Sequence, residues 1–512
     1  MAPRDKTGDI EMSPTRADEK AIYEYEEALE LTGHGKYNYL MLFTCFVVII
    51  AMGTDIFGLG IIVTAATCDL DMTLSQIGIL SSMPFAGIIV MSYPWGYLSD
   101  MRGRRLVLMY AMCGSFISAA LSSLSPTWQI LAALRFISSA MSSAAESATY
   151  ALLGECCISK YRAKYMLLIT SALMLTPTLY YITAYLIMKL DFTVYLLGIV
   201  YRPWRLLTLL MAIPLGVATL CLWYFSESPK FLANVGKGDE AVEVMKRMYL
   251  VNGHDEKTFP IKQIFLEDGN KEAVGDFSFH SLWVQIAPLF KPPLLFRTFL
   301  LYYLTFVTYI ANNSFAIILP TIFNIFFTSY ATSVEGASFC DLFKLTNTTE
   351  VIVETKQDEL ICKNTIEDNT IWAGCVHGLS FFLLNALISQ WAHKRKILTI
   401  IVLIIAAAAA IAIESTGEAI SGLVLFYVFL TTAMVFGVIS SYFVDLYPTS
   451  YRGMVACLGM MVARLSAFAG TNIVSGAMTN DCSTALYGGA GIVLSGVVAA
   501  FFLPSDSQIS SN

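Results

Sequence analysis

The chain has 512 residues, of which 56% are hydrophobic and only 14% are charged. Soluble globular proteins are about a quarter charged, so this composition argues against a water-soluble enzyme. The apolar residues suffice for about a dozen membrane spans of about 20 residues each. A net charge of -7 without a clustered basic face also excludes a nucleic-acid partner. We therefore expect the lipid bilayer to be the solvent of this chain.

Residues 1–36 are polar and mixed in charge, and they lack the apolar core and cleavage site of a signal peptide. They predict a cytosolic N-terminal tail. Uncharged runs of bilayer length then recur on both sides of a long polar stretch, 226–297. Six are predicted at 37–63, 74–98, 106–124, 128–153, 165–188 and 203–225. Six more are predicted at 298–327, 370–391, 397–413, 420–444, 453–476 and 484–503.

These runs predict an all-α polytopic membrane protein with twelve transmembrane helices. Residues 37–225 form an N-terminal six-helix bundle and 298–503 a C-terminal one, joined by the central cytosolic loop 226–297 and followed by a cytosolic tail, 504–512. Membrane proteins retain Lys and Arg on the cytoplasmic side, and most of the 32 Lys and Arg residues are cytosolic if both termini are inside. The sequence therefore predicts cytosolic termini and an outside loop at 328–369.

The predicted outside loop carries two cysteines and a glycosylation signal. Cys340 and Cys362 lie in a compartment where disulfides persist, so we predict that they are bonded to each other; two free thiols are the alternative. Asn347 begins the sequence Asn-Thr-Thr, an N-glycosylation signal. The 11 cysteines form no CxxC motif and no cluster with histidine, so no metal site is predicted.

The two halves share charged residues at one constant offset. Such a recurrence indicates a duplicated architecture, as in carriers built from two parallel repeats. The matches are Arg104–Arg105 with Lys394–Arg395, Glu155 with Asp445, and Arg162 with Arg452.

Several short motifs resemble those of the major facilitator superfamily. Residues Gly96–Arg105 read GYLSDMRGRR, similar to the signature GxxxD(R/K)xGR(R/K), with Met101 in place of a basic residue. Trp204–Arg205, Glu227–Lys230 (ESPK) and Asp445–Thr449 (DLYPT) resemble motifs of the sugar and organic-ion carriers, whose usual forms include PESPR and ELYPT. The resemblance implies the major facilitator fold and transport by alternating access.

Two further segments resemble the synaptic vesicle glycoprotein 2-like branch of that superfamily. They are Cys68–Ser75, before the second span, and Asn234–Ala241, after the sixth. The glycosylatable loop 328–369 suits this branch, although it is much shorter than in the vesicle proteins. The resemblance implies a glycoprotein of the plasma membrane or of a secretory or synaptic vesicle membrane.

Charged residues gather at the predicted cytosolic ends of the helices. We expect them to pair across the cytosolic face when the two bundles close together there, or to hold one bundle rigid. The resemblance implies that such pairs stabilise the outward-open state; the alternative is that they only fix the topology. The predicted conformational network comprises Asp100, Arg104, Arg105, Glu155, Arg162, Glu227, Asp445 and Arg452.

Four charged residues stand out inside predicted spans, where charge is costly and usually marks a functional path: Asp55, Arg135, Glu146 and Arg464. Asp55 is predicted to face the substrate path and to attract a cation or carry a proton; an interhelical hydrogen bond is the alternative. Arg135 and Glu146 share one helix face but stand about 16 Å apart along it. Each therefore needs its own partner, and Glu146 is also placed on the substrate or proton path.

Polar and aromatic residues of the second half extend the predicted path. Asn312 and Asn313 interrupt the seventh span and are predicted to bind the substrate or its coupling partner; bonding between helices is the alternative. His377 in the eighth span is placed on the substrate or proton path, because histidine is the side chain that ordinarily titrates near neutrality; a packing role is the alternative. Tyr302, Tyr303, Tyr309 and Phe436 are candidates for stacking on an organic cation, whereas most other aromatic residues are expected to belong to the membrane interface or the core.

These observations predict a secondary active or facilitative transporter of a small organic ion or polar solute, with protons as a candidate coupling ion. The rival prediction is a non-transporting membrane protein that acts in binding or trafficking, of the vesicle-glycoprotein type. An enzyme is not predicted, because no nucleophile triad, metal cluster or phosphate loop is present in the sequence. No cofactor is expected.

Overall fold

The computed structural model describes residues 22–196, 198–265, 287–332, 338–342, 368–389, 394–447 and 449–504. Two predicted features of the outside loop, the glycosylation site Asn347 and the cysteine Cys362, lie outside these residues.

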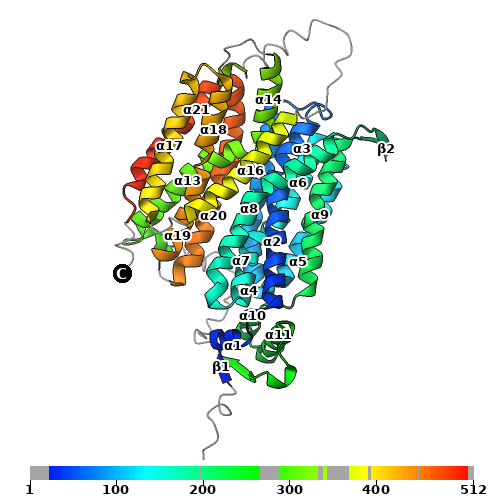
Figure 1. Cartoon of the computed structure of the whole chain (residues 1–512), viewed down its shortest axis with the longest axis vertical. Coiled ribbons are helices and arrows are strands. Elements are labelled where there is room, and N and C mark those ends of the chain that lie inside the picture. The colour runs from blue at the N-terminus through cyan, green and yellow to red at the C-terminus, as the bar shows by residue number, and fades with distance from the viewer. Residues whose placement is uncertain are drawn as a thin grey trace, which may run out of the picture.

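The N-terminal bundle follows the six predicted spans, with two of them broken (Figure 1). The first span becomes two helices that meet at Gly58, and the fourth becomes two helices that meet at Ser143. The helices are α2 (Lys36–Phe57), α3 (Leu59–Ala66), α4 (Leu74–Arg102), α5 (Arg104–Ser122), α6 (Trp128–Ser142), α7 (Ala144–Cys156), α8 (Ser159–Met188) and α9 (Pro203–Tyr224).

The C-terminal bundle repeats this arrangement, and again two spans are broken. Its helices are α13 (Leu295–Ala316), α14 (Leu319–Thr332), α16 (Asp368–Ser389), α17 (Arg395–Ser415), α18 (Ala419–Leu430), α19 (Ala433–Asp445), α20 (Thr449–Asn480) and α21 (Cys482–Ala500). Every predicted span thus corresponds to one helix or one broken pair, which confirms the all-α fold of two six-helix bundles. Within the described residues, eight helical stretches alone are long and apolar enough to cross a membrane, and the bent pair of α13 and α14 adds a ninth.

A small polar cap covers one end of the N-terminal bundle (Figure 1). It consists of β1 (Ile22–Glu24), α1 (Tyr25–Leu31), α10 (Pro229–Asn234), α11 (Gly238–Val251) and β4 (Gln263–Phe265). Strands β1 and β4 pair in parallel, so the segment before the first span is joined to the segment after the sixth. We call this end of the molecule the cap end; it is the end predicted to be cytosolic.

Three further short elements lie between these helices. A hairpin of β2 (Val194–Leu196) and β3 (Ile199–Tyr201) precedes α9. The 3-10 turn η1 (Glu256–Thr258) precedes β4, and the 3-10 turn η2 (Ala287–Phe290) precedes α13.

The two bundles touch at the end opposite the cap. The Thr64 hydroxyl of α3 lies 2.8 Å from the Thr321 hydroxyl of α14. Lys189, after α8, pairs with Asp368 of α16 at 3.8 Å. Close to this end, the backbone of α16 at Gly374 lies so near Tyr181 of α8 that a Cβ atom would not fit. The structure is therefore closed at the end that the topology predicts to be outside.

Candidate functional site

An ion pair between the two bundles lies deep in the fold. Glu146 stands in the first turn of α7, directly after the helix break at Ser143, and its carboxylate accepts a hydrogen bond from the guanidinium of Arg464 in α20. The Arg464 side chain is 6% exposed and that of Glu146 is 24% exposed. A charge pair this sheltered from water is held by its own mutual attraction and is costly to leave half-broken. It therefore connects the bundles energetically as well as geometrically.

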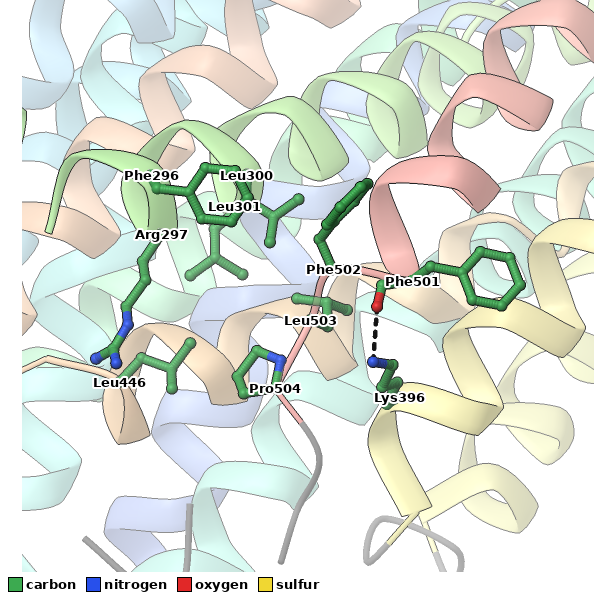
Figure 2. Close-up of a pocket in the computed structure, with 10 residues that line it drawn as sticks. All are labelled: Phe296, Arg297, Leu300, Leu301, Lys396, Leu446, Phe501, Phe502, Leu503 and Pro504. Carbon is green, nitrogen blue, oxygen red and sulfur yellow. Dashed lines mark hydrogen bonds between the residues drawn. The ribbon is translucent and has the colours of Figure 1, made fainter. Parts of the chain in front are cut away.

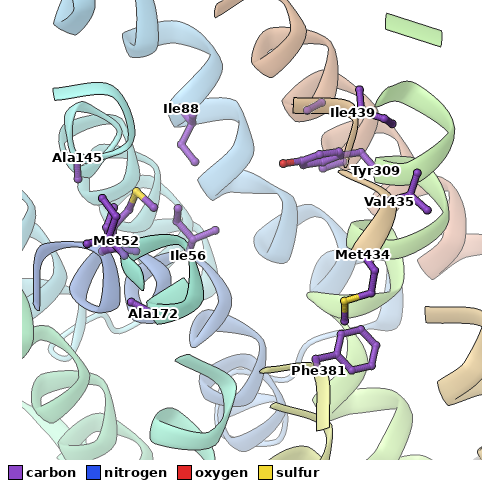
Figure 3. Packing of buried hydrophobic residues seen from close by; sticks show 14 of the residues in the cluster. Met52, Ile56, Ile88, Ala145, Ala172, Tyr309, Phe381, Met434, Val435 and Ile439 are labelled. Atoms are coloured by element: carbon purple, nitrogen blue, oxygen red, sulfur yellow. The ribbon is translucent and has the colours of Figure 1, made fainter. Parts of the chain in front are cut away.

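Aromatic side chains surround this pair. Tyr309 of α13 is buried and lies close enough to interact electrostatically with Glu146, Arg464 and Tyr150. The Phe436 ring of α19 meets the Tyr309 ring edge-on, with ring centres 4.8 Å apart. Figure 3 shows the Tyr309 hydroxyl directed away from Val435 and Ile439, toward the side on which Ile88 of the N-terminal bundle lies. The centre of the molecule thus joins a carboxylate, a guanidinium and aromatic rings from both bundles.

The other two in-span charges form a second pair, inside the N-terminal bundle. Arg135 Nη1 of α6 donates to Asp55 Oδ1 of α2 at 3.1 Å, and both side chains are almost fully buried. Ser138 donates to Asp55 Oδ1 at 2.7 Å and Ser142 to Oδ2 at 3.1 Å. Both serines are therefore hydrogen-bond donors to the carboxylate.

This second pair is sealed from solvent in the observed state. Asp55 is 1% exposed, so its predicted position on a solute path stays a prediction. Within the described residues, Arg135 Nε and Nη2 have no hydrogen-bond partner. Two donors of the Arg135 guanidinium are thus unsatisfied by described residues, and the charge on Asp55 is the main compensation for Arg135.

Asn312 and Asn313 lie on α13 just before the break that separates it from α14. Asn312 Nδ2 donates to Asn313 Oδ1 at 3.1 Å, and both side chains are partly exposed. Asn313 is one helical turn beyond Tyr309 and so lies on the same face of α13. Asn313 thus lies next to Tyr309, which interacts with the central pair; the role of the two asparagines in binding stays a prediction.

His377 of α16 packs within the C-terminal bundle. Its ring lies 4.2 Å from the Phe381 ring and 5.3 Å from the Tyr427 ring, measured between centres. The side chain is buried, and its Nδ1 has no hydrogen-bond partner among the described residues. This environment suits the packing alternative; the predicted role on a substrate or proton path remains untested.

At the cap end, Glu155 is the centre of the predicted charge network. Arg104 Nε lies 3.2 Å from Glu155 Oε1, and Arg104 Nη2 lies 3.0 Å from Asp100 Oδ1. The Ser228 hydroxyl donates to the other Glu155 oxygen. Glu155 lies beyond the predicted span 128–153, and burial raises the pKa of its carboxyl although Arg104 and Ser228 oppose the shift.

Glu227 holds the start of α5 against the end of α9. Its carboxylate accepts hydrogen bonds from the backbone nitrogens of Arg105 at 2.9 Å and Leu106 at 3.1 Å, which are unpaired donors of a helix N-terminus. The Arg105 guanidinium in turn donates to two carbonyls at the end of α9. Gly103 precedes this turn with φ of 104°, and a Cβ atom there would collide with Glu227. The end of the GxxxD-type signature therefore fixes the start of α5 against the end of α9.

The remaining members of the predicted network either contact the polar cap or have side chains outside the described residues. Arg162 Nη2 lies 2.9 Å from each carboxylate oxygen of Glu26 in α1, a partner that the sequence did not suggest. Asp445 and Arg452 lie on α19 and α20, but their side chains are outside the described residues. Every described pair joins elements of the N-terminal bundle and its cap. This arrangement fits the expectation that the charges hold one bundle rigid.

Asp100 and Glu155 should contribute very differently to stability. Asp100 is 72% exposed, so Asp100→Asn should change the free energy of unfolding by at most about 1 kcal/mol. Glu155→Gln leaves Arg104 and Ser228 poorly paired and should cost about 1–3 kcal/mol. Thermal unfolding of the purified variants in detergent compares them directly. Equal losses in the two variants would contradict a buried centre at Glu155.

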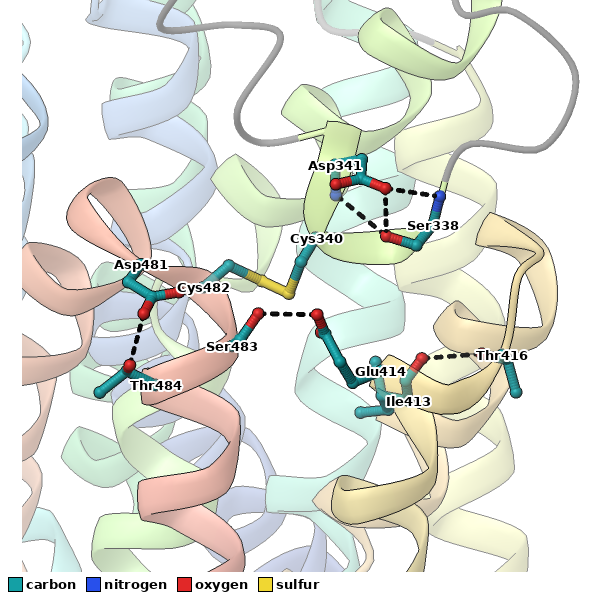
Figure 4. The surroundings of a disulfide bond; sticks show 10 residues. All are labelled: Ser338, Cys340, Asp341, Ile413, Glu414, Thr416, Asp481, Cys482, Ser483 and Thr484. Atoms are coloured by element: carbon teal, nitrogen blue, oxygen red, sulfur yellow. Dashed lines mark hydrogen bonds between the residues drawn. A yellow bond between two sulfur atoms is a disulfide. The ribbon is translucent and has the colours of Figure 1, made fainter.

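The predicted disulfide partner of Cys340 is wrong. Cys340 is bonded to Cys482, the first residue of α21, with a Cα–Cα distance of 5.5 Å (Figure 4). The two cysteines come from different segments that reach the same end of the bundle, and spacing along the chain does not reveal this proximity. Cys68 is also disulfide-bonded. Beside the bridge, Ser483 donates to Glu414 Oε1 at 2.9 Å, which ties α21 to α17.

Removing the Cys340–Cys482 bridge should lower stability markedly. The bridge joins residues 142 positions apart, and disulfides that close long loops contribute about 2–5 kcal/mol. Cys482→Ser should therefore lower the melting temperature in detergent, and reductant, which also breaks the disulfide of Cys68, should lower that of the unmodified protein at least as far. The matched control is Cys221→Ser, which removes a free cysteine of α9. A peptide map that links Cys340 to another cysteine would refute the pairing.

Comparison with known proteins shows the family to which this chain belongs and the folds that resemble it. Residues 44–471 match the profile described as Major Facilitator Superfamily, so the chain belongs to that superfamily. The fold is similar to the xylose transporter XylE from E. coli in its partially occluded inward-open conformation, with a TM-score of 0.64 over 92% of this chain and 98% of XylE. It is also similar to the inward-open form of XylE, with a TM-score of 0.62. Sequence identities of 14% and 16% limit this likeness to the fold.

The curated relatives confirm the resemblance to the vesicle-glycoprotein branch. Synaptic vesicle glycoprotein 2C of Mus musculus is 27% identical over 259 residues, which are 49% of this chain and 36% of that protein. Synaptic vesicle glycoprotein 2A of Rattus norvegicus is 26% identical over 267 residues, 50% of this chain and 36% of that protein. The matched stretch thus covers about a third of the length of these relatives.

Proposed function

We propose that this multi-pass membrane protein is a secondary transporter that moves a small organic ion or polar solute by alternating access. The observation that carries the proposal is the Glu146–Arg464 pair, which joins the two bundles deep in the fold. Membership of the superfamily and the similarity of the fold to a xylose transporter support it. Carriers of this architecture rock two bundles about a site near the middle of the membrane.

The ion pair explains how binding drives that motion. One bundle separates from the other only if the bond between Glu146 and Arg464 breaks, and each charge then needs a new partner. A solute with a charged or strongly polar group supplies such a partner, whereas a proton on Glu146 removes that charge and leaves Arg464 available to the solute. A ligand shifts a conformational equilibrium only through different affinities for the two states. Competition for Glu146 and Arg464 provides such a difference.

Proton coupling is the second element of the proposal, with Asp55 as the candidate carrier. Its carboxylate is bound by Arg135 and two serines in the closed state observed here. Protonation would remove its attraction for Arg135 and loosen the contact between α2 and α6. A solved neighbour of similar fold is described as a proton:xylose symporter, which makes protons a reasonable coupling ion for this chain.

The decisive experiment is uptake into proteoliposomes that contain the purified protein. Organic cations, organic anions and sugars are offered with and without an inward proton gradient, and protein-free liposomes are the control. Saturable uptake of one class, accelerated by the gradient, is expected. If no solute moves while the protein gives a sharp thermal transition, the rival function in binding or trafficking at the plasma membrane or a vesicle membrane takes its place.

A further inference from the structure

A pocket of about 340 Å³ opens at the cap-end level of the C-terminal bundle (Figure 2). Helices α13 and α17 begin beside it, and α19 and α21 end beside it. Four helices therefore start or stop at this level, which is where the chain leaves the bilayer. The pocket is far along the fold from the central pair, and none of the residues assigned to the solute path lines it.

The walls of the pocket are apolar and partly face the outside of the bundle. Phe296, Phe501 and Phe502 are 61%, 59% and 62% exposed, as expected of side chains that meet lipid at a membrane interface. Leu301 and Leu503 form the buried part of the lining. The Phe296 and Phe502 rings meet edge-on, with centres 6.2 Å apart. This surface suits the upper part of an acyl chain.

Two cations stand at the polar side of the same pocket. Arg297 is exposed and makes no hydrogen bond or ion pair with any residue that the structure describes. Lys396 donates through Nζ to the Phe501 carbonyl at 2.7 Å and retains two further donors. In Figure 2 they flank the segment that runs from Phe501 to Pro504. None of the described residues that line the pocket is acidic, so the two cations are not compensated by any of them.

We propose that this pocket binds the headgroup of an anionic glycerophospholipid of the cytosolic leaflet. The lipid phosphate pairs with Arg297, Lys396 adds positive charge on the other side of the segment Phe501–Pro504, and an acyl chain packs against Phe296 and Phe502. Basic pockets between transmembrane helices on the cytoplasmic side bind anionic headgroups in this way, because the charge pairs in a medium of low dielectric constant. The exposed phenylalanines distinguish a lipid from a free phosphate, which would gain nothing from them.

The test measures binding of dioleoyl phosphatidylserine to the purified full-length protein by native mass spectrometry. Phosphatidylserine should bind, and phosphatidylcholine and soluble glycerophosphoserine should not. Each basic residue near the membrane surface contributes about fivefold in affinity for anionic lipid. Arg297→Gln should therefore weaken binding about fivefold, and the double variant with Lys396→Gln about thirtyfold. Lys237→Gln, which removes an exposed lysine at the N-cap of α11, is the matched control and should leave binding unchanged.

Three outcomes would overturn the proposal. They are equal affinity for phosphatidylcholine, binding of glycerophosphoserine as strong as that of the intact lipid, and unchanged affinity in Arg297→Gln. Because Arg297 is exposed and makes no hydrogen bond or ion pair with a described residue, its replacement should leave the fold intact, and the single variant is decisive even if loss of Lys396 destabilises the end of α21. The lipid assay needs no solute, so its failure is distinguishable from failure of the transport function.

Discussion

Replacing Glu146 by Gln is expected to lower uptake of the transported solute by at least about tenfold while leaving the protein folded. The substitution removes the charge that compensates Arg464, whose side chain is 6% exposed. Breaking one side of a sheltered pair costs about 3–5 kcal/mol, and about 1.4 kcal/mol already corresponds to a factor of ten in an equilibrium. The state in which the bundles are joined at this level should therefore become much less populated.

The same variant should change which end of the molecule is accessible. A cysteine introduced at Thr64, which contacts Thr321 in the observed state, should react faster with an impermeant maleimide when Glu146 is replaced. The double variant Glu146→Gln/Arg464→Gln should be more stable than either single variant, because it leaves no unpaired charge. Glu240→Gln, which breaks an exposed pair with Lys237, is the matched control. Uptake by Glu146→Gln at the rate of the unmodified protein would refute the central role of the pair.

Span length and apolarity were sufficient to predict the number and place of the membrane spans, because a bilayer demands about 20 apolar residues from each helix. They did not predict the breaks at Gly58 and Ser143. The first contains a glycine, but the second lies between residues that are ordinary inside a helix. Helix breaks in membranes depend on neighbours that satisfy the freed backbone groups. That information is tertiary, and a window along the chain does not contain it.

The charged residues of the candidate site could be picked out from the sequence, but the ion pairs that they form could not. Asp55, Arg135, Glu146 and Arg464 stand out because charge is rare inside spans. Helical spacing correctly showed that Arg135 and Glu146 need separate partners. Which acid meets which base depends on how helices rotate against one another, and that arrangement is visible only in the structure. The disulfide partner of Cys340 was missed for the same reason.

Substitution of one partner in the buried pair of Asp55 and Arg135 should lower stability more than substitution in an exposed pair. Asp55→Asn leaves Arg135, 1% exposed, without a counter-charge, so the free energy of unfolding should fall by about 3–5 kcal/mol. If Asp55 carries the coupling proton, uptake driven by a proton gradient should also be lost. Thermal unfolding in detergent and gradient-driven uptake in proteoliposomes measure the two effects separately.

A double variant separates a proton carrier from a merely structural pair. Asp55→Asn/Arg135→Met removes both charges and replaces the guanidinium by an apolar side chain, so most of the lost stability should return, because no buried charge remains uncompensated. A structural pair predicts that gradient-driven uptake returns together with stability. A proton carrier predicts a stable protein that exchanges solute across the membrane but no longer responds to the gradient, because no carboxylate is left at this position to bind and release the proton. Restored gradient-driven uptake would therefore remove Asp55 from the proton path and leave Glu146 as the acid that remains.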